Sequence, residues 1–166
     1  MQILCDISKE KVLKAIEQDN QYSEVIPMDL SIPLRIYFDI DILYHDSNAL
    51  LRNILDHINR ILGTIDNEWV ICEGSHETDR GYKCSFHILS KYHTLSLIQL
   101  RELCKMINKE SIRVDPSVYY NMGGTYAFFR FPNQSKIYEE SIPMKIIQGE
   151  LNDFLITETE GLTPLY

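Results

Sequence analysis

The amino-acid sequence predicts an α+β fold in which helices cover one face of an antiparallel sheet. Three stretches alternate apolar and polar residues with the two-residue period of strands: 34–43, 83–89 and 126–131. Two further stretches, 46–62 and 94–108, repeat apolar residues with the period of a helix, and each lies between predicted strands. A chain of 166 residues can bury one substantial core, so we expect a single domain.

The first half of the chain divides at capping and turn residues. A first helix is predicted over 8–19, capped by its serine, and the two prolines of 20–33 predict a connecting loop. The helix that follows the first strand begins at Asp46 or Ser47, and Gly63 ends it. Its buried face is predicted to consist of Leu50, Leu51, Ile54, Leu55, Ile58, Ile61 and Leu62.

The second half alternates strands with one more helix. The polar stretch Gly74–Gly81 predicts a hairpin loop, and 111–125 predicts a longer loop. The second large helix begins at Thr94 or Ser96 and ends near Asn108. Its inward residues are Leu97, Leu100, Leu103, Cys104 and Ile107. The predicted strands are 68–73, 83–89, 126–131 (closed by Pro132) and two further C-terminal candidates, 142–147 and 151–157.

From 34 to 131 the predicted order is β-α-β-β-α-β, the order of the ferredoxin-like or RRM-like unit. In that topology 34–43 and 83–89 are central neighbours, and 126–131 lies beside 34–43. Both helices then pack on one face of the sheet and cover the even-numbered apolar residues of the first strand. The opposite face of that strand, which carries its polar residues, is expected to stay open.

Composition and charge limit the classes of function. The net charge of −8 argues against a broad surface that binds nucleic acid by charge alone. The N-terminus lacks a basic region followed by a long apolar one, so no secretory signal is expected. No stretch approaches the roughly 20 apolar residues of a membrane span, so no membrane role is expected. Scattered cysteines without a CxxC pair are typical of reduced thiols in an intracellular protein. They are Cys5, Cys72, Cys84 and Cys104.

The first strand carries two acids on its polar side. Arg35, Tyr37, Asp39 and Asp41 alternate with isoleucines and a phenylalanine, so the two carboxylates point the same way. Neighbouring carboxylates repel each other, and a bound cation relieves the repulsion; hard oxygen ligands suit Mg²⁺ or Mn²⁺. The alternative is a solvated strand face with two incidental acids.

The strand over 83–89 brings complementary groups. Lys83, Ser85 and His87 share one face, and the predicted strand pairing places them beside Asp39 and Asp41. A lysine charge with hydroxyl and imidazole donors suits a triphosphate. A structural histidine is the alternative for His87.

Three later residues are further candidates. Arg130 and Lys136 add two cations that can reach a phosphate, although ordinary surface charge is an alternative for both. Asp115 precedes the strand over 126–131 and can supply the third carboxylate of a two-metal site. Its alternative is a turn residue before Pro116.

In order, spacing and strand phase these motifs resemble those of the archaeo-eukaryotic primase superfamily, most closely PrimPol-type enzymes and primases of large DNA viruses. The resemblance covers about 34–136. The matching residues are Asp39-Ile40-Asp41, Lys83-Cys84-Ser85-Phe86-His87, Asp115-Pro116-Ser117-Val118-Tyr119, Phe129-Arg130 and Ser135-Lys136. Asp41 stands where some relatives have Glu, and the insert 121–125 lengthens the interval after Asp115.

The resemblance implies the primase-polymerase fold and a DNA primase or primase-polymerase: a template-directed nucleotidyltransferase that makes or extends primers in DNA replication. It implies that Asp39, Asp41 and Asp115 hold two divalent ions, Mg²⁺ or Mn²⁺. It implies that Lys83, Ser85, His87, Arg130 and Lys136 bind the nucleotide. Arg80 in the loop 74–82, with Tyr119 or Tyr120, is the candidate contact for the template.

The implied partners are single-stranded DNA, nucleoside triphosphates and a replicative helicase. The chain is expected to be the N-terminal part of a larger primase-helicase or a small stand-alone protein. If it is viral, it acts in the host-cell replication compartment.

The same residues bear on four other functions. A non-catalytic RRM-like module that binds single-stranded nucleic acid remains open, as does an inactive primase-fold subunit of a replisome. A structural zinc site is not expected, because Cys84 and His87 point to opposite faces of one strand. A nicking endonuclease is disfavoured, because His87 and His93 lie six positions apart.

Overall fold

The fold is described from a computed structural model, which covers residues 9–16, 23–109, 112–120, 126–134 and 142–165. Its helices are α1 (Lys9–Ile16), α2 (Ser47–Leu62) and α3 (Leu97–Asn108), with 3₁₀ turns η1 (Asp66–Glu68), η2 (Pro116–Tyr119) and η3 (Leu151–Asp153). Its strands are β1 (Ser23–Pro27), β2 (Pro33–Leu43), β3 (Trp69–Glu73), β4 (His76–Thr78), β5 (Gly81–Ser96), β6 (Tyr126–Arg130), β7 (Lys145–Gln148) and β8 (Thr163–Pro164).

The two large predicted helices begin at predicted capping residues, whereas Ser8, the predicted cap of the first helix, lies outside the described residues. The Asp46 side chain accepts from Ala49 N at the start of α2, and Gly63 ends that helix in the left-handed conformation, with φ 69°. Ser96 and Gln99 form a capping box at the start of α3. The five predicted inward residues of α3 are all buried, which confirms its predicted core face.

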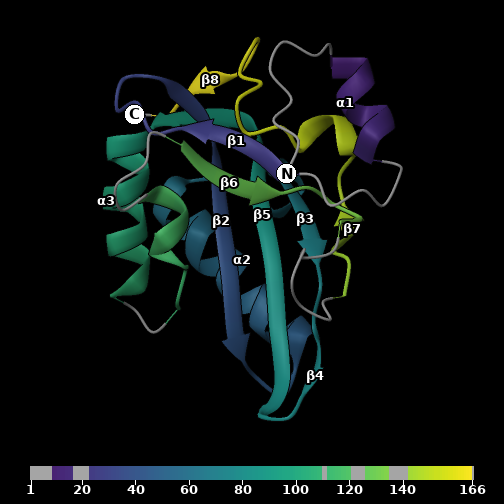
Figure 1. The fold of residues 1–166 in the computed structure, drawn as a ribbon. Coiled ribbons are helices and arrows are strands. Elements are labelled where there is room, and N and C mark those ends of the chain that lie inside the picture. Colours follow the sequence, from purple (N-terminus) through teal and green to yellow (C-terminus); the bar gives the residue numbers. More distant parts are fainter. Residues whose placement is uncertain (1–8, 17–22, 110–111, 121–125, 135–141, 166) are drawn as a thin grey trace.

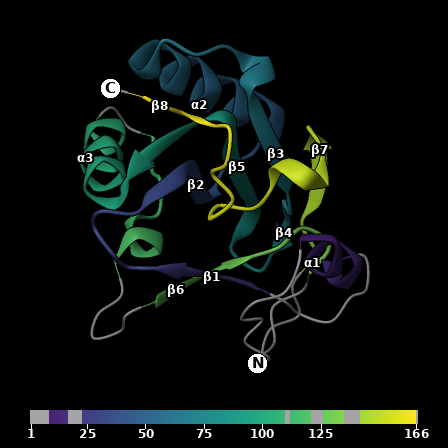
Figure 2. The same cartoon turned by 90° about the horizontal axis from the view of Figure 1, so that it is seen from above.

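The main sheet has the order β2-β5-β3-β7; β4 and β8 also pair with β5. The expected antiparallel pairing of the first strand with the 83–89 strand is confirmed, although β5 extends further in both directions. The α+β class is therefore correct, and the antiparallel pairing with its helices is compatible with a ferredoxin-like core. In Figure 2, α2 covers one side of this sheet, and α3 lies toward its β2 edge in Figures 1 and 2.

Two strand predictions are wrong. The expected place of β6 beside β2 is not found; β6 pairs with β1, a strand in the segment predicted to be a loop, and the two form a separate sheet. The C-terminal candidate 151–157 contains η3 and irregular backbone instead of a strand. The hairpin predicted at 74–81 is present, with β4 as its outgoing strand.

The two-stranded β1–β6 sheet lies on the face of the main sheet opposite α2 (Figure 2). Ala127 and Phe129 of β6 are buried against the main sheet, and Tyr126 and Phe128 are exposed on the other side. The expectation that the polar face of β2 stays open is therefore only half correct. Arg35 is 3% exposed and Tyr37 is fully buried, and the face becomes accessible only from Asp39 onward.

Candidate functional site

Strand register brings the acids of β2 to the polar residues of β5. Asp39 lies directly opposite His87, Asp41 opposite Ser85, and Leu43 opposite Lys83. Directly opposed residues of an antiparallel pair project to the same face. The predicted shared face of Asp39, Asp41, Lys83, Ser85 and His87, hereafter the acidic face, is therefore confirmed.

Each carboxylate of the acidic face has a basic side chain beside it. Lys83 Nζ lies 2.8 Å from Asp41 Oδ2, and His87 Nε2 lies 3.6 Å from Asp39 Oδ1. The side chains of Asp39 and Asp41 are 22% and 34% exposed, respectively. Solvent and solutes can reach both acids.

The aromatic rings of β6 and the C-terminal segment form the inner wall of the acidic face. The His87 ring lies 4.1 Å from the Phe129 ring, centroid to centroid, and 6.2 Å from the ring of Phe154. These contacts bury the imidazole, so only its Asp39 side can meet a ligand on the acidic face. Ser85 is also buried, and its backbone holds the hairpin through Ser75 Oγ and Gly74 N.

An open hollow of about 580 Å³ lies beyond the end of β2. Leu43 shares the face of Asp41, and it lines this hollow together with Tyr44, His45, Glu77 and Tyr82. The Tyr44 and His45 rings are stacked, with centroids 4.7 Å apart.

Asp115 reaches β2 with its backbone. Asp115 N donates to Asp39 O at 2.8 Å. Tyr37 Oη donates to Val118 O at 2.9 Å, and Tyr119 Oη donates in return to Tyr37 O. These bonds hold η2 along the edge of β2. The Asp115 carboxylate itself accepts from Ser117 N at 2.8 Å and caps η2.

The remaining sequence candidates are not brought to the acidic face in the same way. Arg130 follows Phe129 at the end of β6, and it is partly buried. Lys136 lies outside the described residues. Arg80 occupies the exposed turn of the β4–β5 hairpin. Tyr119 is fully buried, whereas Tyr120 is 41% exposed.

The donor chemistry of the acidic face fits a divalent cation at Asp39 and Asp41, whose carboxylate oxygens are accessible on one side of one strand. Within the described residues, no three His, Cys, Asp or Glu side chains are grouped as a metal site requires. Asp115 as a third ligand stays a prediction. Cys72 and Cys84 are buried free thiols, and burial raises the pKa of both.

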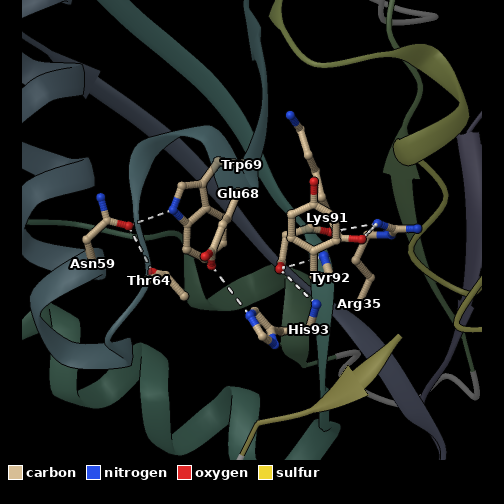
Figure 3. Close-up of polar contacts among 9 residues, drawn as sticks. Arg35, Asn59, Thr64, Glu68, Trp69, Lys91, Tyr92 and His93 are labelled. Atoms are coloured by element: carbon tan, nitrogen blue, oxygen red, sulfur yellow. Dashed lines mark hydrogen bonds and ion pairs between the residues drawn. The ribbon is translucent and has the colours of Figure 1, made fainter. Parts of the chain in front are cut away.

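Sequence reasoning missed the two residues that anchor the covered end of this face. Arg35 donates to the carbonyls of Ser90, Lys91 and Leu155 at 2.7–3.0 Å (Arg35 and Lys91 are labelled in Figure 3). Glu24, in the segment predicted to be a loop, accepts from Ile156 N, Thr157 N and Thr157 Oγ1. The signal available was Arg35 itself, a charged residue in the middle of an apolar stretch.

No protein-family model matches the chain, and no curated protein matches it in sequence. Among the described residues, no helix has the length and apolar character needed to span a membrane.

Proposed function

We propose that this chain is the catalytic domain of a template-directed nucleotidyltransferase, a DNA primase or primase-polymerase that makes or extends primers during replication. One observation carries the proposal. The β2–β5 register sets Asp39 against His87 and Asp41 against Ser85 on one face, with Lys83 beside Asp41, and both acids are partly exposed. Two acids next to a lysine, a hydroxyl and an imidazole are the groups that metal-assisted phosphoryl chemistry uses.

Asp39 and Asp41 are the proposed metal ligands, with Asp115 as a third. A divalent ion held there would supply positive charge for the attacking 3′-hydroxyl and for the departing pyrophosphate. Asp115 Oδ1 already accepts from Ser117 N, whereas the side chains of Asp39 and Asp41 are partly exposed.

The remaining groups bind and orient the nucleotide. Lys83, which contacts Asp41 in the structure, would bind the triphosphate if a metal neutralised that carboxylate. Ser85 and His87 are the proposed hydrogen-bond donors to phosphate oxygens. Burial of both residues fixes their positions on β5. Phosphate contacts from Arg130 and Lys136 remain part of the proposal.

A second candidate is a non-catalytic module that binds single-stranded nucleic acid, including an inactive subunit of a replisome. The Lys83–Asp41 contact of 2.8 Å favours it, because an internal cation already neutralises this acid. Under this alternative the polar cluster serves stability, and no metal is needed.

One assay separates the two candidates. The protein is incubated with single-stranded DNA template, labelled nucleoside triphosphates and Mg²⁺ or Mn²⁺, in parallel with Asp39→Asn and with Asp66→Asn as a matched control outside the acidic face. We expect metal-dependent product from wild type and from Asp66→Asn, and a loss of at least about 100-fold in Asp39→Asn.

Direct metal binding provides a readout besides activity. Mn²⁺ binding, followed by electron paramagnetic resonance, is expected for wild type and reduced in Asp39→Asn with unchanged circular dichroism. Absence of both Mn²⁺ binding and product in wild type, alongside metal-independent binding of single-stranded DNA, would rule out the enzyme in favour of the binding module.

A further inference from the structure

A second hollow of about 330 Å³ lies between α3 and η2, away from the acidic face. We call it the basic groove; its lining residues are Arg101, Cys104, Lys105, Asn108, Lys109, Pro116 and Tyr120. Three of these carry positive charge and none carries a carboxylate, in a chain whose net charge is −8. A local concentration of cations on an acidic protein points to an anionic ligand.

The cations follow one stripe of α3. Arg101, Lys105 and Lys109 are spaced four residues apart, so they lie on one side of the helix, about 6 Å apart along its axis. Lys105 Nζ contacts Glu102 Oε1 at 2.6 Å, but this pair is exposed and a phosphate can compete for the lysine. A row of charges of this kind suits an extended polyanion better than a single small anion.

An exposed aromatic ring completes the groove. The Arg101 guanidinium lies 4.5 Å from the centroid of the Tyr120 ring, and Arg101 Nε donates to Tyr119 O at 3.0 Å. Arg101 thus fixes the ring at the edge of the groove, while Tyr120 remains 41% exposed. A held, accessible ring beside a row of cations is the arrangement with which proteins stack the bases of a single strand.

The basic groove adjoins the acidic face through η2. Pro116 lines the groove, and the preceding residue, Asp115, bonds to Asp39 through its backbone N–H. A nucleic-acid strand bound along α3 would therefore pass next to the acidic face.

We propose that the basic groove binds single-stranded nucleic acid, with Arg101, Lys105 and Lys109 on its phosphates and Tyr120 stacked on a base. As the template track of a polymerase this rests on the proposed function; as a binding surface it stands on the groove alone. Duplex is excluded as the preferred ligand, because its bases are already stacked on one another and cannot meet Tyr120.

The test measures fluorescence anisotropy of labelled single strands of about 16 nucleotides, oligo(dT) and oligo(U), without divalent metal or nucleotide. The variants are Lys105→Ala/Lys109→Ala and Tyr120→Leu. The control is Lys145→Ala on β7, an exposed lysine on the side of the molecule opposite α3 in Figures 1 and 2. The two oligonucleotides show whether the groove distinguishes DNA from RNA.

The two kinds of contact give different signatures. Removing both lysines is expected to weaken binding about tenfold or more and to reduce the slope of log K against log salt by about 1.4. Tyr120→Leu is expected to weaken binding between about 5-fold and 100-fold with the salt slope unchanged. Glu102→Gln, which frees Lys105, is expected to strengthen binding, and Lys145→Ala to leave it unchanged.

The outcomes that overturn the groove differ from those that overturn the enzyme. The groove is rejected if wild type does not bind the labelled strands. It is also rejected if the double lysine variant binds them as tightly as Lys145→Ala does, or if wild type binds a labelled duplex as tightly as a single strand. Asp39→Asn is expected to bind oligo(dT) as wild type does. Loss of binding in the groove variants together with absence of nucleotide incorporation in wild type rejects the polymerase and leaves the groove standing.

Discussion

The two ends of one face of β2 have opposite environments. Arg35 and Tyr37 at one end are buried, whereas Asp39 and Asp41 at the other are 22% and 34% exposed in their side chains. All four residues follow the same two-residue alternation. Alternation therefore decides which face a side chain takes, and the packing of distant segments decides whether that face is buried.

Two distant segments cover the Arg35 end. The backbone of Arg35 donates to Ile156 O, and its guanidinium reaches Leu155 O and Glu158 O. Glu24 of β1 holds the same segment through Ile156 N and Thr157. The pairing of β2 with β5 is irregular at this point, because β5 bulges. The Arg35 guanidinium donates hydrogen bonds to the Ser90 and Lys91 carbonyls in the bulge (Figure 3). The covered end is thus a polar anchor, whereas the open end has the chemistry of a ligand site.

Breaking this anchor is expected to have the largest effect on stability. Arg35→Leu leaves three buried or partly buried carbonyls without their donor. It also removes the positive charge that interacts with the Glu24 carboxylate. We expect a loss of about 3–5 kcal/mol in the free energy of unfolding, measured by urea denaturation. Arg52→Leu, at an exposed arginine of α2, is the control and should change stability by less than about 0.5 kcal/mol. Equal effects of the two changes would contradict the anchor.

Glu24 gives the anchor a pH dependence. Burial raises the pKa of the Glu24 carboxyl above its ordinary 4.5, against the opposing effect of its hydrogen bonds to Thr157 and Ile156. A raised pKa in the folded state means that the folded protein binds the proton more tightly than the unfolded chain. The stability that this provides is fully present below pH 4.5 and is lost as pH rises through the raised pKa. Between pH 4.5 and the raised pKa, the loss is about 1.4 kcal/mol for each pH unit.

The matched variant for this prediction is Glu24→Gln, which cannot titrate. The free energy of unfolding is measured against pH for both proteins. The wild type should lose stability relative to Glu24→Gln as pH rises above 4.5. Parallel profiles would show that Glu24 does not contribute to the pH dependence.

The sequence predicts the local part of this architecture and not its long-range part. Alternation and capping identify β2, α2, β5 and α3, because these signals lie within each segment. They also place Asp39, Asp41, Lys83, Ser85 and His87 on one face. Strand β1 was missed because a five-residue strand that ends in Pro27 carries a weak strand signal, and its stability comes from pairing with β6. The same pairing removes β6 from the edge of β2, which no signal within β6 reveals.

The tyrosine pair at the β2 edge is expected to have an intermediate effect. Tyr119 Oη donates to the buried Tyr37 O, and burial raises the pKa of both phenols, so both remain neutral donors. Tyr119→Phe leaves that carbonyl unsatisfied and should cost about 1–3 kcal/mol of unfolding free energy. Tyr120→Phe, at the exposed neighbour, is the control and should be close to neutral. A neutral Tyr119→Phe would show that η2 is held at β2 mainly by the Asp115 N–H and by packing.

The smallest effect on stability is expected at the Asp41 end of β2. The size of this effect distinguishes a metal site on the acidic face from a purely structural cluster. Asp41→Asn removes the negative partner of Lys83 Nζ, and because both side chains are partly exposed the change should stay within about 1 kcal/mol. A double-mutant cycle of Asp41→Asn with Lys83→Met measures the coupling free energy of the pair directly.

A coupling of about 0.2–1 kcal/mol fits a lysine that is free to turn to a triphosphate. Mn²⁺ affinity should then rise in Lys83→Met, because the competing cation is gone, while nucleotide incorporation falls. A coupling above about 2 kcal/mol, with Mn²⁺ affinity unchanged in Lys83→Met, would make the pair a second structural anchor. The open end of β2 would then resemble its covered end, and the metal-site interpretation of Asp41 would be lost.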